Sequence, residues 1–425
     1  MPKLTRTATT TTRPRFLSLL LLTAFLPACD NAGDESATGV AGTLDGPDVI
    51  VTAVTEDVFT VGSIAGDDWD TFGSVRSVHF DAHGNLHIFD SQADHIVVVG
   101  PDGSLVRTVG GRGEGPGEFD GVTSVIVGRD GSHIAMGFSH IDLLQADGEF
   151  VRRITMDPMT TGIVIANMAL PDGRLLAGGI MRFGDDDEEA EEGRPIHIFP
   201  LDGNEPEVLY TAWKLPDDDE DETSVSGSAE TGMRVAWSAG RAFEPILSYD
   251  LLTDGSVALI DSIGYRVKLI GLDGIVTGTI ERPIAPIAVD DAIMEAGRER
   301  YRESMARDIS LRTTSRIQIE REGAEGLAFA DEVPVLYRLK VDWGDRIWVQ
   351  RRGPTGDDDG PTDIVTPRGD YIGTLQPDGL RTPSAFGPNG LLAYIEHDEM
   401  EVPTVRVVRL VTLEPEESPR TQAGS

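Results

Sequence analysis

The sequence predicts an all-β protein, a six-bladed β-propeller of four-stranded antiparallel blades with one inserted helix. Three observations lead to this prediction. A strand-turn-strand unit recurs, its hairpin turn carries a glycine at similar intervals, and only one segment has a convincing helical pattern. A four-stranded sheet cannot bury its apolar faces alone, so the copies must stack against one another.

The clearest copy of the unit runs over residues 75–119. Four short stretches of alternating apolar residues are separated by tight polar turns: Val78/Phe80, Leu86/Ile88, Ile96/Val98 and residues 105–109. Alternation with a period of two is typical of half-buried strands. This segment therefore predicts one complete blade.

The number of hairpin turns indicates the number of blades. The turns carry Gly84, Gly131, Gly173, Gly255, Gly344 and Gly390, which lie 42 to 47 residues apart except for two intervals of 82 and 89. Glycine provides the positive φ that such turns need. Six turns predict six blades, with an insertion in each of the two long intervals.

The propeller is predicted over residues 48–412. Its first insertion, about 184–240, is acidic, and its second, about 288–328, contains the helix, about 291–309, with Asp290 or Asp291 as its cap. The segment 49–64 precedes the first complete unit. We expect it to add the missing strand to the last blade, which would remove an exposed sheet edge.

The N-terminus has the pattern of an export signal. Residues 1–15 carry four basic side chains and no acid, and the apolar run 16–28 is too short to cross a bilayer as a helix. The chain's only cysteine, Cys29, follows directly in a Leu-Pro-Ala-Cys sequence that resembles the bacterial lipobox. This resemblance implies cleavage after residue 28 and lipidation of Cys29. We further expect a flexible tether over 29–47 and a disordered tail over 413–425.

These features predict an exported, membrane-anchored lipoprotein on the periplasmic side of the bacterial cell envelope. The formal net charge of −36 argues against nucleic acid and anionic lipid surfaces as partners. The lipid is therefore the expected contact with the membrane. We expect a monomer.

Part of the sequence resembles a known repeat family. The stretch VGGRGEGPGEF at 109–119, followed by a strand and Asp130-Gly131, is similar to the NHL repeat of six-bladed propellers. The whole layout also resembles TolB-like and other six-bladed bacterial lipoproteins of uncharacterised function. Asp90 and Asp261 occupy matching places after the second strand of their units. The resemblance implies that they fix the turn between blades through backbone hydrogen bonds.

Few residues suggest chemistry. His79, His83 and His87 are spaced by four, but the segment reads as a hairpin, where His79 and His87 face each other as a weak metal candidate. The acidic runs leave calcium open as a ligand, although Glu222 stands where a calcium loop needs glycine. Arg298, Arg300 and Arg302 leave open an anion beneath the helix. We predict no catalytic residue, no metal site and no bound cofactor.

The predicted function is a lipid-anchored binding or scaffold module for a protein, a glycan or a small ligand. The alternative is a metal-dependent hydrolase or lyase, similar to lactonases or amidating lyases, with a metal at the ring axis. A third reading is a structural brace in an envelope complex. The propeller fold does not choose among them, because function resides in sites rather than in the fold.

Overall fold

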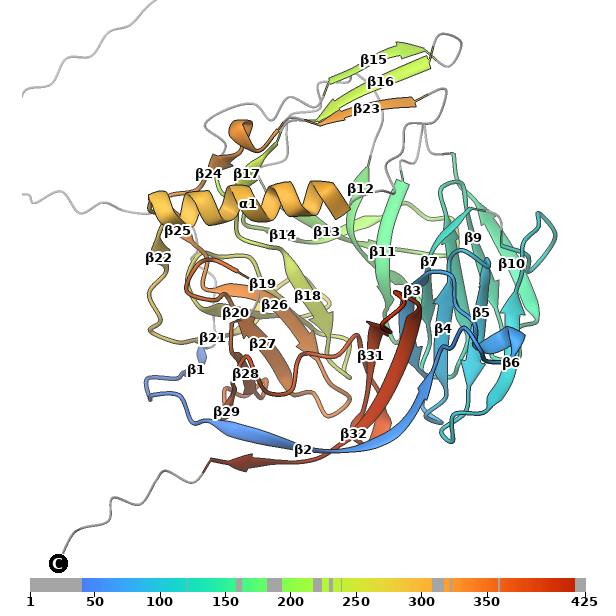
Figure 1. Cartoon of the computed structure of the whole chain (residues 1–425), viewed down its shortest axis with the longest axis horizontal. Coiled ribbons are helices and arrows are strands. Elements are labelled where there is room, and N and C mark those ends of the chain that lie inside the picture. Colours follow the sequence, from blue (N-terminus) through green and yellow to red (C-terminus); the bar gives the residue numbers. More distant parts are fainter. Residues whose placement is uncertain are drawn as a thin grey trace, which may run out of the picture. The chain divides into compact units, whose positions relative to one another are not determined.

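The computed structural model shows a propeller of six four-stranded antiparallel blades (Figure 1). It describes residues 40–416, apart from 120, 158–162, 182–192, 217–223, 229–231, 238, 308–316, 322 and 358–359, and it leaves out the side chains of a few further residues. The predicted fold class is confirmed.

The first three blades follow the chain from the innermost strand outward. Blade 1 consists of β3 (Val75–Phe80), β4 (Leu86–Asp90), β5 (His95–Val99) and β6 (Leu105–Gly110). Blade 2 consists of β7 (Val122–Val127), β8 (His133–Gly137), β9 (His140–Leu144) and β10 (Phe150–Thr155). Blade 3 consists of β11 (Ile163–Ala169), β12 (Leu175–Met181), β13 (Arg194–Phe199) and β14 (Glu207–Ala212).

The last three blades include strands from both ends of the chain. Blade 4 consists of β18 (Ser248–Leu251), β19 (Val257–Ile260), β20 (Arg266–Ile270) and β21 (Val276–Glu281). Blade 5 consists of β26 (Leu336–Val341), β27 (Ile347–Arg351), β28 (Thr362–Val365) and β29 (Tyr371–Leu375). Blade 6 consists of β30 (Ala385–Phe386), β31 (Leu391–His397), β32 (Pro403–Pro415) and β2 (Val51–Val61).

Five of the six turn glycines have the expected backbone. Gly84, Gly131, Gly173, Gly255 and Gly390 have φ between +77° and +87°. In the turn of blade 5 the positive φ falls instead on Asp345, at +61°. Aspartate tolerates this conformation, and the backbone N–H of Thr253 in blade 4 donates to its carboxylate at 2.8 Å. The turn is therefore displaced by one residue from Gly344.

Among the described residues, the apolar core of the ring is divided into six clusters, one for each pair of neighbouring blades. Phe89 of blade 1, for example, packs with Val125 of blade 2, and Trp348 of blade 5 packs with Tyr394 of blade 6. The other four clusters join blades 2–3, 3–4, 4–5 and 6–1. Each blade therefore shields its neighbour's faces, which is why the stack is stable only as a ring.

The ring closes by pairing the two ends of the chain. Strand β2 is the outer strand of blade 6 and runs antiparallel to β32, with Val51 opposite Pro415 and Val61 opposite Val405. This is the closure that the sequence suggested for residues 49–64. Because β2 is eleven residues long, its partner β32 extends to Pro415, three residues past the predicted end of the propeller at 412.

Part of the predicted tether belongs to the sheet. Strand β1 (Val40–Thr43) pairs in parallel with β21 as a fifth strand of blade 4. Farther along, the backbone N–H of Thr374 in blade 5 donates to the Val49 carbonyl at 2.8 Å. Residues 40–50 therefore follow the outer edges of blades 4 and 5, where unpaired backbone groups are available to a passing chain.

The two insertions pair with each other. Strands β15 (Ser224–Ser228) and β16 (Gly232–Trp237) of the first insertion form a three-stranded sheet with β23 (Ile317–Arg321) of the second (Figure 1). Short pairs also join β17 (Arg241–Ala242) to β24 (Ala328–Phe329), and β22 (Ile287–Ala288) to β25 (Glu332–Val333).

Helix α1 (Asp291–Arg307) starts at the predicted residue, and Asp290 accepts a hydrogen bond from the backbone N–H of Ile293 at 2.9 Å. Its buried residue Ile293 packs with Phe243 and Val333, which anchors the helix to both insertions. Among the described residues, no helix has the length and apolar character needed to cross a membrane.

Candidate functional site

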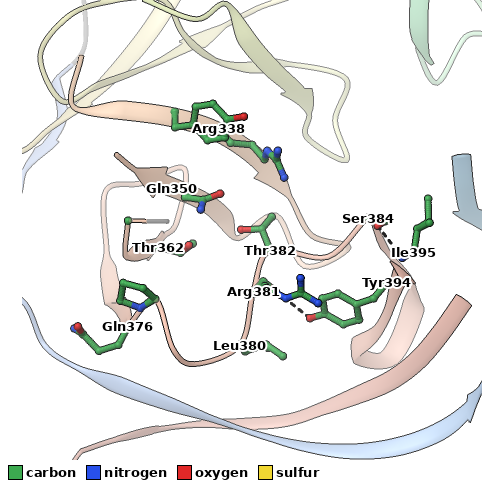
Figure 2. A pocket seen from close by; sticks show the side chains of 13 residues that line it. Arg338, Gln350, Thr362, Gln376, Leu380, Arg381, Thr382, Ser384, Tyr394 and Ile395 are labelled. Atoms are coloured by element: carbon green, nitrogen blue, oxygen red, sulfur yellow. Dashed lines mark hydrogen bonds between the residues drawn. The ribbon is translucent and has the colours of Figure 1, made fainter. Parts of the chain in front are cut away.

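A polar pocket of about 300 Å³ lies between blades 5 and 6 (Figure 2). It is lined by residues of strands β26, β27, β28 and β31, by Gly360, and by the segment 376–384 that connects the two blades. Its polar lining side chains include Arg338, Gln350, Gln376, Arg381, Thr382 and Tyr394. Small-molecule sites are concave and combine apolar walls with a few polar groups, and this concave site is richer in polar groups than is usual.

The wall of the pocket is held in place by hydrogen bonds. The connecting segment is joined to β31 through Ser384, whose backbone N–H donates to the Ala393 carbonyl at 2.8 Å and whose Oγ accepts from the Ile395 N–H at 3.2 Å. The Tyr394 hydroxyl donates to the Arg381 carbonyl at 3.0 Å (Figure 2). These bonds fix the segment before any ligand arrives, which lowers the entropic cost of binding.

Two cations of β26 lie at this pocket. Arg338 is exposed and lines it, and in Figure 2 its side chain extends toward the segment that carries Thr382 and Arg381. Lys340, two residues later on the same face of the strand, donates from Nζ to the carbonyl of the lining residue Ser384 at 3.0 Å. Burial lowers the pKa of Lys340. The carboxylate of Asp250 opposes this effect, and the nearby charge of Arg338 adds to it.

The other arginine of the pocket is neutralised. Arg381 pairs with Glu396 at 3.1 Å. Arg338 has no carboxylate partner among the described residues and stacks only on Tyr337, with its guanidinium 5.3 Å from the ring centre. In a chain with 72 acidic and 36 basic residues, an exposed arginine without an acidic partner leaves a local positive charge inside a concave site.

A second polar cluster is buried between blades 1 and 2. We call His79, His87 and His133 the histidine row. His87 and His133 are 2 % and 1 % exposed, and His87 Nδ1 lies 2.9 Å from His133 Nε2. His79 is the register partner of His87 across the β3–β4 hairpin, as the sequence suggested. The His79 Nε2 atom is buried and has no hydrogen-bond partner in the structure.

The paired histidines His87 and His133 each contact a further hydrogen-bond acceptor. His87 Nε2 lies 3.4 Å from Asp81 Oδ2, and His133 Nδ1 lies 3.4 Å from the Gln145 carbonyl. Together with the contact between His87 and His133, these are three contacts, and each needs one ring hydrogen. Two neutral imidazoles carry only two such hydrogens. One of the contacts at 3.4 Å therefore lacks a hydrogen while both rings are neutral.

The histidine row is neutral at pH 7. Burial lowers the pKa of His79 to about 4, with the charge of Lys340 as the next cause, and burial beside His87 lowers the pKa of His133 to about 4. The pKa of His87 is also lowered by burial, although the Asp81 carboxylate opposes this. Imidazoles are the side chains whose charge changes most readily near neutral pH, so this interface responds to acid.

The two aspartates singled out in the sequence are fully buried. Asp90 accepts backbone N–H bonds from Gly73, Ser74, Gln92 and Ala93 at 2.7 to 3.3 Å. Asp261 accepts the backbone N–H of Trp213 at 2.9 Å and an ion pair from Lys268 at 3.1 Å. Asp90 thus reaches the segment that precedes β3 of its own blade, and Asp261 reaches the residue that follows β14 of blade 3.

We expect Asp90→Asn to reduce the free energy of unfolding by about 1–3 kcal/mol, because an amide presents N–H groups to backbone N–H donors. Urea unfolding measures this loss. Asp147→Asn is the matched control, since Asp147 is exposed and its carboxylate accepts one backbone hydrogen bond among the described residues, from the N–H of Glu149 at 3.0 Å. Equal losses in both variants would contradict a special structural role for Asp90.

The other candidates from the sequence lie elsewhere. The arginines of the helix are engaged: Arg298 stacks on Phe329, Arg300 donates to the Thr355 carbonyl, and Arg302 pairs with three glutamates. Cys29 and the acidic run 217–222 lie outside the described residues. Among the described residues, no three or more His, Cys, Asp or Glu side chains are grouped to hold a metal ion.

The sequence analysis missed the pocket. Its residues come from five separate segments between 337 and 395, and each segment reads as ordinary strand or loop. One signal was present: Arg338 and Lys340 place two cations on one face of a strand in a strongly acidic chain. It also missed His133, because His133 belongs to a different blade from His79 and His87.

No protein-family model matches the chain, and no curated protein matches it. Solved structures do resemble it. A member of the DUF4221 family from Bacteroides vulgatus ATCC 8482 is 12 % identical with a TM-score of 0.49, and the match covers 87 % of this chain and 100 % of that one.

Two enzymes are among the other similar structures. Virginiamycin B lyase from Staphylococcus aureus is 12 % identical with a TM-score of 0.38, covering 83 % of this chain and 99 % of its own. A gluconolactonase from Xanthomonas campestris is 11 % identical with a TM-score of 0.37, covering 86 % and 98 %. Similarity at this level is not evidence of a shared activity.

Proposed function

We propose that the chain is an exported, lipid-anchored propeller that binds a small ligand in the pocket between blades 5 and 6. The observation that carries this proposal is the pocket itself, a polar cavity of about 300 Å³ lined by Arg338, which has no carboxylate partner within the described part of the chain. Preformed pockets of roughly 300–1,000 Å³ are typical of small-ligand sites. The export and anchoring part rests on the signal pattern and on Cys29.

The metal-dependent hydrolase or lyase remains the alternative function from the sequence. We propose binding rather than this chemistry because the polar lining of the pocket is suited to hold a small molecule. The NHL-like and TolB-like resemblance is compatible with either function and does not decide between them.

Binding is tested by thermal unfolding in the presence of mixtures of small neutral sugars, carboxylates and amines. We expect at least one mixture to raise the melting temperature of the wild-type protein but not that of Thr382→Trp, which fills the pocket. Val151→Trp is the control, because Val151 is 53 % exposed on blade 2. If no mixture stabilises the protein, or if Thr382→Trp retains the shift, the pocket is not the binding site.

The anchor is tested separately. We expect the wild-type protein to fractionate with membranes and to incorporate labelled lipid, and Cys29→Ala to do neither, because the thiol is the group that would carry the lipid. Cys29→Ser is a second variant that keeps a small polar side chain. Lipid labelling that persists in both variants would refute the lipoprotein assignment without affecting the pocket.

A further inference from the structure

We propose that the pocket between blades 5 and 6 selects a small hydroxylated carboxylate, of the chemical class of sugar acids. This inference rests on the proposed function, since it names the ligand class of the same site. It follows from three properties of the pocket: its charge, its hydrogen-bond donors and the state of its aromatic rings.

The charge of the pocket favours an anion. Arg338 is exposed, lines the pocket and has no carboxylate partner among the described residues. Lys340 holds the Ser384 carbonyl at 3.0 Å, and the buried Asp250 carboxylate lies near its charge, so Arg338 supplies the positive charge that faces the pocket. The rest of the chain is strongly acidic, so an anion is repelled by most of the surface and attracted here. An arginine fork matches the two oxygens of a carboxylate.

The remaining polar groups favour hydroxyls. Gln350 and Gln376 contribute amides to the lining, and the Thr382 hydroxyl oxygen is buried without a hydrogen-bond partner in the structure. A buried hydroxyl that has no partner is costly. A ligand hydroxyl that bonds to Thr382 Oγ1 would remove this cost, which a bare carboxylate such as acetate cannot do once its oxygens are held by Arg338.

The aromatic rings of the pocket are already occupied by cations. Arg338 and Arg352 lie 5.3 and 4.9 Å from the ring centre of Tyr337, and Arg381 and Arg406 lie 6.0 and 5.5 Å from that of Tyr394. The rings are therefore poorly placed to stack on an apolar or aromatic ligand. A polar, acceptor-rich molecule suits this lining better than a large apolar one.

The test is isothermal titration of the full-length protein with D-glucuronate, D-glucose, acetate and inorganic phosphate. We expect glucuronate to bind at least ten-fold more tightly than each of the other three. Arg338→Gln should weaken glucuronate binding at least ten-fold, and Arg338→Lys should weaken it less. Arg368→Gln is the matched control, since Arg368 is an exposed arginine of blade 5 outside the pocket lining.

The outcomes separate this inference from the proposed function. Glucose binding as tightly as glucuronate, or an unchanged affinity of Arg338→Gln, overturns the ligand class while the pocket remains a binding site. Phosphate or acetate binding as tightly as glucuronate reduces the site to a simple anion site and also overturns the class. Absence of glucuronate binding overturns it directly. Glucuronate binding that persists in Thr382→Trp would place the ligand elsewhere and overturn the proposed function as well.

Discussion

Lowering the pH from 7 to 5 is expected to reduce the free energy of unfolding by about 2 kcal/mol for each of His79 and His133. The burial of these two side chains lowers the pKa of each from 6.5 to about 4 in the folded protein. Between these two values the unfolded chain binds more protons than the folded one. The stability is therefore complete above pH 6.5 and is lost as the pH falls toward 4.

The charges around the histidine row set this response. Asp81 faces His87, Arg107 acts on His87 and His133, Asp130 acts on His133, and Lys340 acts on His79 from the inner strand of blade 5. Three of these four groups lie in blades 1 and 2, so protonation is expected to loosen the interface between these blades first. Hydrogen exchange at pH 7 and pH 5, corrected for intrinsic rates, locates the loosening.

Variants distinguish the contribution of the histidine row to the pH dependence of stability from that of other titrating groups. His133→Gln keeps a hydrogen-bonding side chain but cannot gain the proton, so its unfolding free energy should depend less steeply on pH between 6.5 and 4 than that of the wild type. His397 is exposed, and His397→Gln should leave the wild-type dependence unchanged. Identical pH profiles for the wild type and His133→Gln would show that the buried pair does not control the acid response.

Arg282→Gln is expected to cost about 3–5 kcal/mol of unfolding free energy, because it leaves the buried Asp363 carboxylate with only the more distant Arg351, at 3.4 Å, as a cationic partner. The Arg282 side chain is 3 % exposed and pairs at 2.8 Å with both Asp363, which is fully buried, and Asp48. Arg351 completes the network with an ion pair to Asp48 at 2.6 Å. The cluster joins blades 4 and 5 to the segment just before β2.

Equilibrium unfolding in urea measures this cost. The matched control is Arg266→Gln, which breaks the pair with Glu281 in the same blade. Those two side chains are 47 % and 40 % exposed, so the expected loss is below about 1 kcal/mol. The double variant Arg282→Met/Asp363→Leu should recover part of the loss, since it removes both buried charges. Equal losses for Arg282→Gln and Arg266→Gln would contradict the assigned importance of the buried network.

The regular part of the fold was predictable from the sequence because it depends on local signals. Alternation of apolar residues and the turn glycines locate the blades, and the helix is predicted at Asp291. The strand β1 was not predicted, because a Gly-rich, polar segment such as 40–47 carries no alternation, and its pairing with β21 depends on a free sheet edge far along the chain. The sheet shared by the two insertions escaped prediction for the same reason.

The candidate site was less predictable. The pocket brings Arg338, Thr382 and Tyr394 together across two blades, and the register and packing that do so are not encoded in any one segment. The histidine row is similar: the pairing of His79 with His87 follows from the hairpin, but the contact between His87 and His133 follows from the stacking of two blades. Long-range contacts of this kind need coordinates.

The pairing of β2 with β32 has a consequence for how the chain acquires its structure. Residues 51–61 are synthesised long before their partner, which ends at residue 415, so the ring cannot close until residue 415 has been made. Until then the unpaired strand exposes its backbone N–H and C=O groups to other chains. The ring is therefore expected to complete its folding only once these two distant strands have paired.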